Sequence, residues 1–177
     1  MECLGADADE VAPRLLGMVL TTRVDGEATS LTITETEAYL PGDAASHAYR
    51  GRTPRNAPMF AEPGTVYVYR SYGIHWCVNI VTGPTGSGQA VLIRGGDPIE
   101  GVQTMIRRRG RADHLTDGPG KLCQAMGIDG SFSGSRLGER LALTGEPGAR
   151  TWNTTPRIGI SVGIDAELRF VASEPAG

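Results

Sequence analysis

Between Thr34 and Asn79 the sequence combines a carboxylate, tyrosines, a histidine and an asparagine on short strand-like segments joined by Gly and Pro turns. A carboxylate such as that of Glu37 can serve as a general acid or base. Polar aromatics and ionisable groups inside strand patterns are costly to bury unless they have partners. The combination therefore points to a ligand pocket.

The strand that carries the carboxylate is expected over residues 31–40, an alternating, Thr-rich run. Because side chains alternate between the faces of a strand, Glu35, Glu37 and Tyr39 are expected on the same face as Leu31 and Ile33. If that face is buried, Glu37 is a candidate acid or base. An exposed edge strand with two solvated glutamates fits this segment equally well, since Glu is seldom fully buried.

His47 lies in the loop-like segment 41–56, where a lone histidine is more often a surface residue than a ligand. The next strand, Thr65–Arg70, places Tyr67 and Tyr69 on one face. Paired tyrosines on a strand can equally be half-buried packing residues.

A hairpin is expected where Thr65–Arg70 is followed, after a short Gly-containing turn, by the strand His75–Ile80. This places Tyr72 at or beside the tip, an aromatic side chain on an exposed turn. The only acid between residues 50 and 70 is Glu62, whereas that stretch holds Arg50, Arg52, Arg55 and Arg70. An aromatic wedge in a basic surround is typical of proteins that bind nucleic acid.

The remaining pattern predicts an α+β fold, a single domain over residues 1–177 with a mostly antiparallel curved sheet, flanking short helices and a protruding β-hairpin. The 25 glycines and 11 prolines fit a loop-rich sheet better than a helical bundle. Helices are expected over Val11–Leu16, Ile99–Arg109 and Lys121–Met126. Strands are further expected over Met18–Arg23, Gln89–Arg94, near Leu141, and over Arg157–Val162 and Leu168–Val171.

The formal net charge of -3 argues mildly against a nucleic-acid binder. However, affinity for nucleic acid depends more on the charges at the binding surface than on the net charge of the whole chain. A basic cluster at 107–111 is either part of such a footprint or a solvated helix end. The three widely spaced cysteines have no zinc-ligand spacing and favour a reducing cytosol. No long apolar run predicts a membrane span, so a cytoplasmic protein without metal or cofactor is expected.

Six blocks of sequence, in order between about Leu31 and Ile128, resemble the alkyladenine (3-methyladenine) DNA glycosylase family. Tyr72-Gly73 and Asn79 match the family in addition to these blocks. The six blocks are Glu35-Thr36-Glu37-Ala38-Tyr39, Asp43-Ala44-Ala45-Ser46-His47, Arg52-Thr53-Pro54-Arg55-Asn56, Met59-Phe60, Pro63-Gly64-Thr65-Val66-Tyr67-Val68-Tyr69, and Gly118-Pro119-Gly120-Lys121-Leu122-Cys123-Gln124-Ala125. The C-terminal Glu167-Leu168-Arg169-Phe170 departs from the Pro-Trp-Arg-Phe-like strand of relatives, which bears on substrate breadth.

The resemblance implies a monofunctional enzyme that flips an alkylated or deaminated purine out of duplex DNA and hydrolyses its N-glycosidic bond. It implies that Glu37 activates the attacking water and that Tyr39 and Tyr69 sandwich the base. It further implies that His47 reads the exocyclic edge of the purine and that Asn79 crowds the position of a guanine amino group.

The resemblance also implies that Tyr72 is the wedge that fills the gap left by the flipped nucleotide. Leu92 and Arg94 share a face of the strand Gln89–Arg94, and the family places a pocket-lining apolar residue and a water-holding Arg there. DNA-backbone contacts are implied for Arg52, Arg55 and Lys121. Lys121 is the single lysine, so a Schiff-base lyase step has few candidate nucleophiles.

The expected partner is double-stranded DNA that contains a damaged purine, bound by a monomer, at the nucleoid if the cell is prokaryotic. Two other classes stay open. One is a non-catalytic nucleic-acid-binding module, in which the tyrosines only stack bases. The other is a hydrolase of free nucleosides, which would need neither a wedge such as Tyr72 nor the surrounding arginines.

Overall fold

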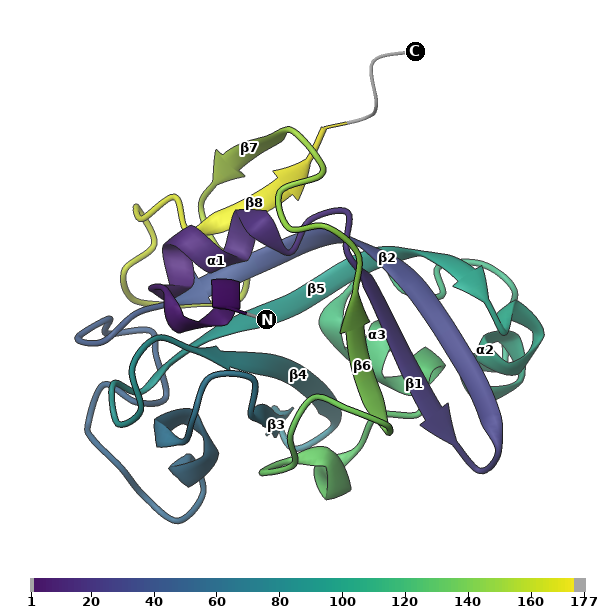
Figure 1. Ribbon diagram of the computed structural model, residues 1–177, viewed down its shortest axis with the longest axis horizontal. Coiled ribbons are helices and arrows are strands. Elements are labelled where there is room, and N and C mark those ends of the chain that lie inside the picture. The colour runs from purple at the N-terminus through teal and green to yellow at the C-terminus, as the bar shows by residue number, and fades with distance from the viewer. Residues whose placement is uncertain (1, 174–177) are drawn as a thin grey trace.

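The computed structural model describes residues 2–173, and its elements are drawn in Figure 1. The described strands are β1 (Val19–Val24), β2 (Glu27–Tyr39), β3 (Val66–Ser71), β4 (His75–Thr82), β5 (Gln89–Glu100), β6 (Leu141–Thr144), β7 (Trp152–Thr155) and β8 (Arg169–Ala172). The described helices are α1 (Ala8–Arg14), α2 (Val102–Arg109) and α3 (Pro119–Met126), with 3-10 turns at Glu2–Gly5, Ala57–Phe60 and Gly130–Phe132.

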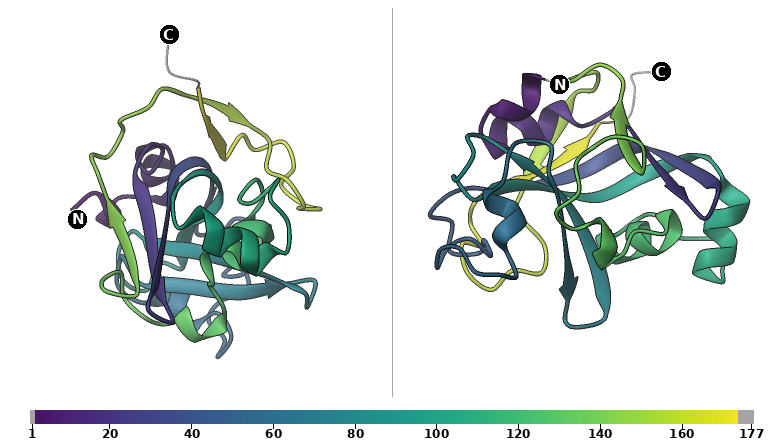
Figure 2. Two further views of the ribbon diagram at one scale, coloured as in Figure 1. Left: turned by 90° about the vertical axis from the view of Figure 1, so that its right-hand side faces the viewer. Right: turned by 60° about the horizontal axis from the view of Figure 1, so that its bottom comes forward.

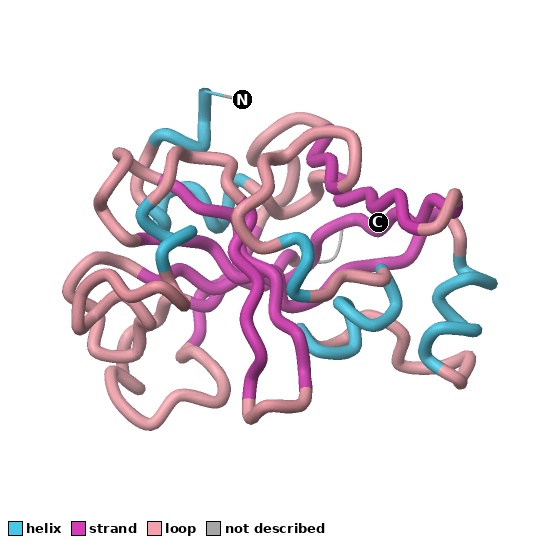
Figure 3. The backbone as a smooth tube through the Cα atoms, turned by 90° about the horizontal axis from the view of Figure 1, so that it is seen from below, coloured by secondary structure: helices cyan, strands magenta, loops and turns pink. Residues whose placement is uncertain are grey.

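All of these strands belong to one antiparallel sheet with the order β3-β4-β5-β2-β1-β6. The long strand β2 has two partners on the side away from β5, because β1 pairs with its first half while β8 pairs with residues 35–37. Strand β7 extends this branch by pairing with β8. The sheet curls, and the β3–β4 hairpin projects from the body (Figure 2, right, and Figure 3). The predicted α+β class with a curved antiparallel sheet and a protruding hairpin is confirmed.

The main core lies between the sheet and the helices. Helix α1 packs against β2 and β5, α3 packs against β4 and β5, and α2 packs against α3. Val11 of α1, Leu122 of α3 and Ile93 of β5 are each fully buried in this core. A separate, smaller apolar cluster joins Met59, Tyr67, Val81 and Ala90. The longest described helices have eight residues, too few to reach across a bilayer.

The strand predicted over Arg157–Val162 is wrong. The structure places β7 earlier in the chain, and an irregular loop runs from residue 156 to residue 168. The alternation of Ile158 and Ile160 with small residues imitates a strand. However, Pro156 lacks a backbone donor and Gly159 adopts a left-handed φ of +77°, and both oppose a continuous ladder.

The helix predicted from Ile99 begins only at Val102, because β5 continues to Glu100. Gly101 makes the transition with a left-handed φ of +69°. A Cβ at this position would lie 2.3 Å from the carbonyl oxygen of Ala28, so only glycine fits. The other predicted elements are present, with ends shifted by a few residues; β2, for example, starts at Glu27 rather than Leu31.

The alternation along β2 is interrupted close to the proposed catalytic residue. Leu31 and Ile33 belong to the main core, and so does Ala38, which has the opposite parity. The register of β2 against β5 shifts on both sides of Glu35, so one residue falls out of the alternation there. Strict alternation predicted that Glu37 shares a face of the strand with Leu31 and Ile33. Because of this interruption, Glu37 lies on the other face.

Candidate active site

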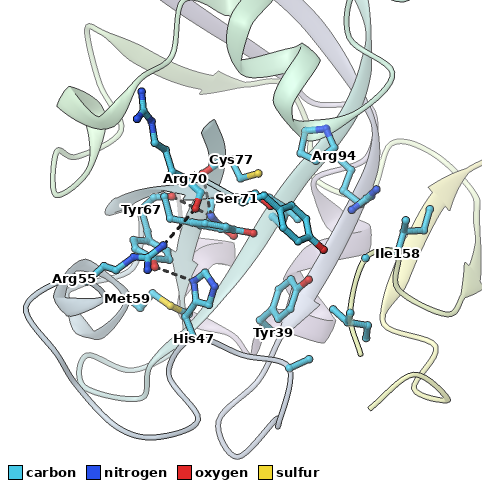
Figure 4. Close-up of a pocket in the computed structure, with 18 residues that line it drawn as sticks. Tyr39, His47, Arg55, Met59, Tyr67, Arg70, Ser71, Cys77, Arg94 and Ile158 are labelled. Carbon is cyan, nitrogen blue, oxygen red and sulfur yellow. Dashed lines mark hydrogen bonds between the residues drawn. The ribbon is translucent and has the colours of Figure 1, made fainter. Parts of the chain in front are cut away.

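A pocket of about 420 Å³ opens beside the C-terminal half of β2, within the size range of small-molecule sites. Figure 4 shows Tyr39, His47 and Arg94 pointing into it, whereas the side chain of Arg70 points away. Of the residues singled out from the sequence, the pocket gathers Tyr39, His47, Arg55, Tyr69, Tyr72, Asn79, Leu92 and Arg94. It does not include Arg52 or Lys121 among its lining residues.

Glu37 lies directly behind the pocket wall with no exposed surface. Its Oε2 accepts a hydrogen bond from the Tyr39 hydroxyl at 2.9 Å, and its Oε1 accepts one from the backbone N–H of Ile158 at 2.9 Å. Nη1 of Arg94 lies 3.2 Å from the same Oε1. All three partners line the pocket. The interpretation of residues 31–40 as a strand with a buried Glu37 is therefore correct. The alternative, an exposed edge strand with two solvated glutamates, is wrong.

Arg94 is held between two carboxylates. Its Nε donates to Oε1 of Glu35 at 2.7 Å, while Nη1 faces Glu37. The same Glu35 oxygen accepts from Nε of Arg169 at 2.6 Å. Burial raises the pKa of Glu35, but the hydrogen bonds from Arg169 and Arg94 outweigh it and hold that pKa below its ordinary value. Glu35 thus stays ionised and fixes the guanidinium of Arg94.

The opposite wall is aromatic. Tyr67 and Tyr69 stack with ring centroids 5.7 Å apart, and His47 meets Tyr69 edge-on at 4.4 Å. Nδ1 of His47 is 3.0 Å from the Tyr67 hydroxyl. Burial and the nearby Arg55 lower the pKa of His47, and burial raises that of Tyr67 to about 12. At neutral pH the pair is therefore a neutral imidazole and a phenol.

Asn79 is buried and lines the pocket, opposite Tyr67 rather than Tyr69 in the β3–β4 ladder. Its Nδ2 donates to the carbonyl oxygen of Tyr67 at 3.0 Å and contacts that of Cys77 at 3.4 Å. Leu92 pairs with Asn79 on one side and with Glu37 on the other. These pairs place the amide and the carboxylate in register on β4 and β2, the two strands that flank β5.

Tyr72 stands at the tip of the β3–β4 hairpin with 84% of its surface exposed. Tyr72 and Gly73 both have positive φ, 51° and 69°, and the N–H of Ile74 closes the turn on the carbonyl of Ser71. Such a turn suits the twist of a tight hairpin. It leaves the ring of Tyr72 projecting at the rim of the pocket.

The basic residues differ in their surroundings. Arg55 lines the pocket and donates to the carbonyl of Arg70, whereas Arg52 is exposed. Lys121 lies at the start of α3 with Nζ 3.0 Å from Asp117. The cluster at 107–111 lies at the opposite end of the β2–β5 ladder and is engaged locally, as in the pairs Arg107–Glu27 and Arg111–Asp113. The structure favours the solvated helix end for that cluster.

Three residues in the pocket wall or next to it carry weak or no signals of their roles in the sequence. Tyr67 was visible as a partner of Tyr69 on the same face, but its bond to His47 was not. The loop residue Ile158 contributes only its backbone N–H, for which side-chain type gives no signal. Glu35 sits two residues before Glu37, and its parity was the available signal.

The chain is similar to known proteins over nearly its whole length. The sequence model of the family described as Methylpurine-DNA glycosylase (MPG) matches residues 2–176. A protein of Rhodopseudomonas palustris (strain BisB18) is 46% identical over 91% of this chain and 80% of its own length. One of Agrobacterium fabrum is 47% identical over 93% and 83%, and one of Methanoculleus marisnigri is 44% identical over 93% and 89%. Each is named "Putative 3-methyladenine DNA glycosylase". The chain belongs to the methylpurine-DNA glycosylase family, DNA repair hydrolases that act on N-glycosyl bonds.

Proposed function

We propose that this enzyme flips an alkylated or deaminated purine out of duplex DNA into the pocket and hydrolyses its N-glycosidic bond with a water activated by Glu37. This is the first step of base excision repair. The observation that carries the proposal is the position of Glu37, a fully buried carboxylate whose three partners all line an aromatic pocket.

Glu37 has one carboxylate acceptor site without a partner among the described residues, and a water reaches it when the pocket side chains in front of it shift. A carboxylate has about four acceptor sites, and within the described chain Tyr39, Ile158 and Arg94 approach three of them. A water on the remaining site could be oriented by Oε2 and lose its proton to the carboxylate as it attacks the sugar carbon. Nη1 of Arg94, 3.2 Å from Oε1, helps to fix the direction of the carboxylate toward the pocket.

The pocket wall suits the leaving group. A purine alkylated on the ring carries positive charge, and the faces of Tyr39 and Tyr69 attract cations while they stack on the ring. Such a base departs without an added proton. A neutral lesion needs more help, and the neutral His47, with Nδ1 engaged by Tyr67, has Nε2 left to contact a purine edge.

The DNA partner is proposed from the rim of the pocket. Tyr72 would fill the space left by the flipped nucleotide and offset a cost of a few kcal/mol for unstacking. Arg52, Arg55 and Lys121 would contact backbone phosphates. We take the acting form to be a monomer in the compartment that holds the chromosome, the cytoplasm of a prokaryotic cell.

The decisive test is Glu37→Gln, which keeps the shape of the side chain but cannot take the proton. Single-turnover excision from a duplex with one lesion should fall by about 10²–10⁴-fold, whereas binding of the lesion duplex should persist. Glu62→Gln, at an exposed carboxylate paired with Arg136, is the matched control and should behave as wild type. Excision by Glu37→Gln at the wild-type rate would refute the assignment, and equal activity on the free nucleoside would point to a nucleoside hydrolase.

A further inference from the structure

An ion pair outside the pocket joins the segments that form it. The guanidinium of Arg157 binds the carboxylate of Asp43 through both terminal nitrogens, with Nη2 3.0 Å from Oδ1 and Nη1 on Oδ2. The two side chains are 1% and 9% exposed. Their residues are 114 positions apart in the chain, so the pair ties the loop after β2 to the loop after β7.

Arg157 also contacts β2 itself. Its Nη1 donates to the carbonyl oxygen of Ala38 at 3.1 Å, and its Cζ lies 4.8 Å from the centre of the Tyr39 ring. Arg157 is not among the residues that line the pocket, whereas Tyr39 is. The guanidinium therefore backs the Tyr39 ring from outside the cavity.

The neighbours of the ion pair in sequence are residues of the site. Ile158, the next residue after Arg157, donates its backbone N–H to Glu37. Asp43 begins the turn that leads to His47, and its Oδ1 also accepts the N–H of Ala45, which lines the pocket. One buried pair thus holds the Ile158 N–H, the Tyr39 ring and the start of the His47 loop at fixed positions.

A buried ion pair is weak evidence for stability, because the cost of desolvating two charges offsets much of their attraction. Its bidentate geometry, however, fixes both partners in direction as well as distance. Such precision matters near a reacting centre, where a displacement of about 1 Å can lower the rate by about 10²-fold.

We propose that Arg157, paired with Asp43, is a positioning residue of the hydrolysis, which it serves by holding the Ile158 N–H on Glu37 and the Tyr39 ring against the bound base. The inference rests on the proposed function, since it assigns Arg157 and Asp43 a role in the action of Glu37. Neither residue is among those that line the pocket.

The test uses Arg157→Lys, which keeps the charge but loses the two-pronged geometry, and Asp43→Asn, which keeps the shape but loses the charge. Both variants should lower single-turnover excision by about 10–100-fold while the dissociation constant for the lesion duplex changes little. The loss should appear in the rate of base release, because the Ile158 N–H and the Tyr39 ring lose their fixed positions beside Glu37. Arg136→Lys, at the exposed pair with Glu62, is the control and should change neither quantity.

Loss of folded protein is separated by two further measurements. The folded fraction of each variant at the assay temperature comes from its melting curve, and added guanidinium ion should partly restore excision by Arg157→Ala. Excision that merely follows the folded fraction, or an Arg157→Ala variant that guanidinium ion leaves unrestored, would overturn the positioning role. If Glu37→Gln excises the lesion at the wild-type rate, the proposed function itself is refuted. If Glu37→Gln is inactive but Arg157→Lys excises at the wild-type rate, only this inference is refuted.

Discussion

The hydroxyl of Tyr39 donates a hydrogen bond to Oε2 of Glu37, two residues earlier on the same strand, at 2.9 Å. Residues i and i+2 share a face of a strand, so the bond follows directly from their spacing. Burial and the negative charge of Glu37 raise the pKa of Tyr39, which therefore remains a phenol and a donor over the working pH range. Tyr39 is thus both a wall of the pocket and a hydrogen-bond donor to the carboxylate that we propose as the general base.

We expect Tyr39→Phe to separate these two roles. The ring is kept, so lesion-duplex binding should stay near the wild-type value. The carboxylate loses one of the donors that orient it, so single-turnover excision should fall several-fold. The excision rate and the dissociation constant for the lesion duplex, measured side by side, test this, and a loss of binding as large as the loss of rate would contradict it.

The sequence predicted much of this arrangement but not the register shift in β2 beside Glu35. Alternation correctly grouped Glu37 and Tyr39, because no register shift falls between these two residues. It wrongly joined them to Leu31 and Ile33, since the register shift beside Glu35 has no marker such as Gly or Pro in β2. The positions of Glu37 and Tyr39 relative to each other were therefore predicted correctly, whereas the face of β2 on which they lie was predicted wrongly.

The loop after β7 could not be predicted for a different reason. Its role at Glu37 depends on the N–H of Ile158 and on the pairing of Arg157 with Asp43 across more than a hundred residues. Local patterns carry no information on such a contact. The hairpin with Tyr72, by contrast, was predictable because turn residues and flanking strands are adjacent in sequence.

Glu35 should govern the stability of this region in acid. Its folded-state pKa lies below the ordinary value of 4.5, so its contribution is fully present above pH 4.5 and is lost as the pH falls through the folded-state value. Glu35→Gln should lower the free energy of unfolding by roughly 1.5–3 kcal/mol at neutral pH. The difference from wild type should shrink below pH 4.5. Urea unfolding at several pH values tests this, and a difference that stays constant would contradict it.

Tyr72→Ala should weaken both specific binding and excision in duplex DNA, because the ring that compensates for unstacking is lost. An expected tenfold drop corresponds to about 1.4 kcal/mol, within the few kcal/mol that flipping costs. In a single-stranded substrate, where less stacking is broken, the loss should be smaller. Tyr72→Phe keeps the ring and should remain close to wild type. Equal losses on both substrates would argue that the substitution merely disturbs the turn.

Asn79 offers the sharpest test of selectivity, because the structure gives it two possible roles. Its amide borders the pocket, where it could exclude the amino group of guanine, yet its Nδ2 also satisfies the carbonyl oxygens of Tyr67 and Cys77. Exclusion acts by a clash with the wrong base rather than by attraction to the right one. A structural amide acts by filling backbone acceptors that would otherwise be buried without a donor.

We expect Asn79→Ser to widen the pocket, so that undamaged guanine begins to be released while excision of 3-methyladenine is largely kept. Asn79→Asp is the control, since it keeps the size of the side chain but loses the donor to the Tyr67 carbonyl. It should lower the melting temperature without any gain on guanine, because a buried acceptor is left unpaired. Excision of guanine and of 3-methyladenine, measured beside the melting curve of each variant, decides between the roles. If both variants lose all activities together with stability, and neither releases guanine, Asn79 supports the hairpin and does not exclude guanine.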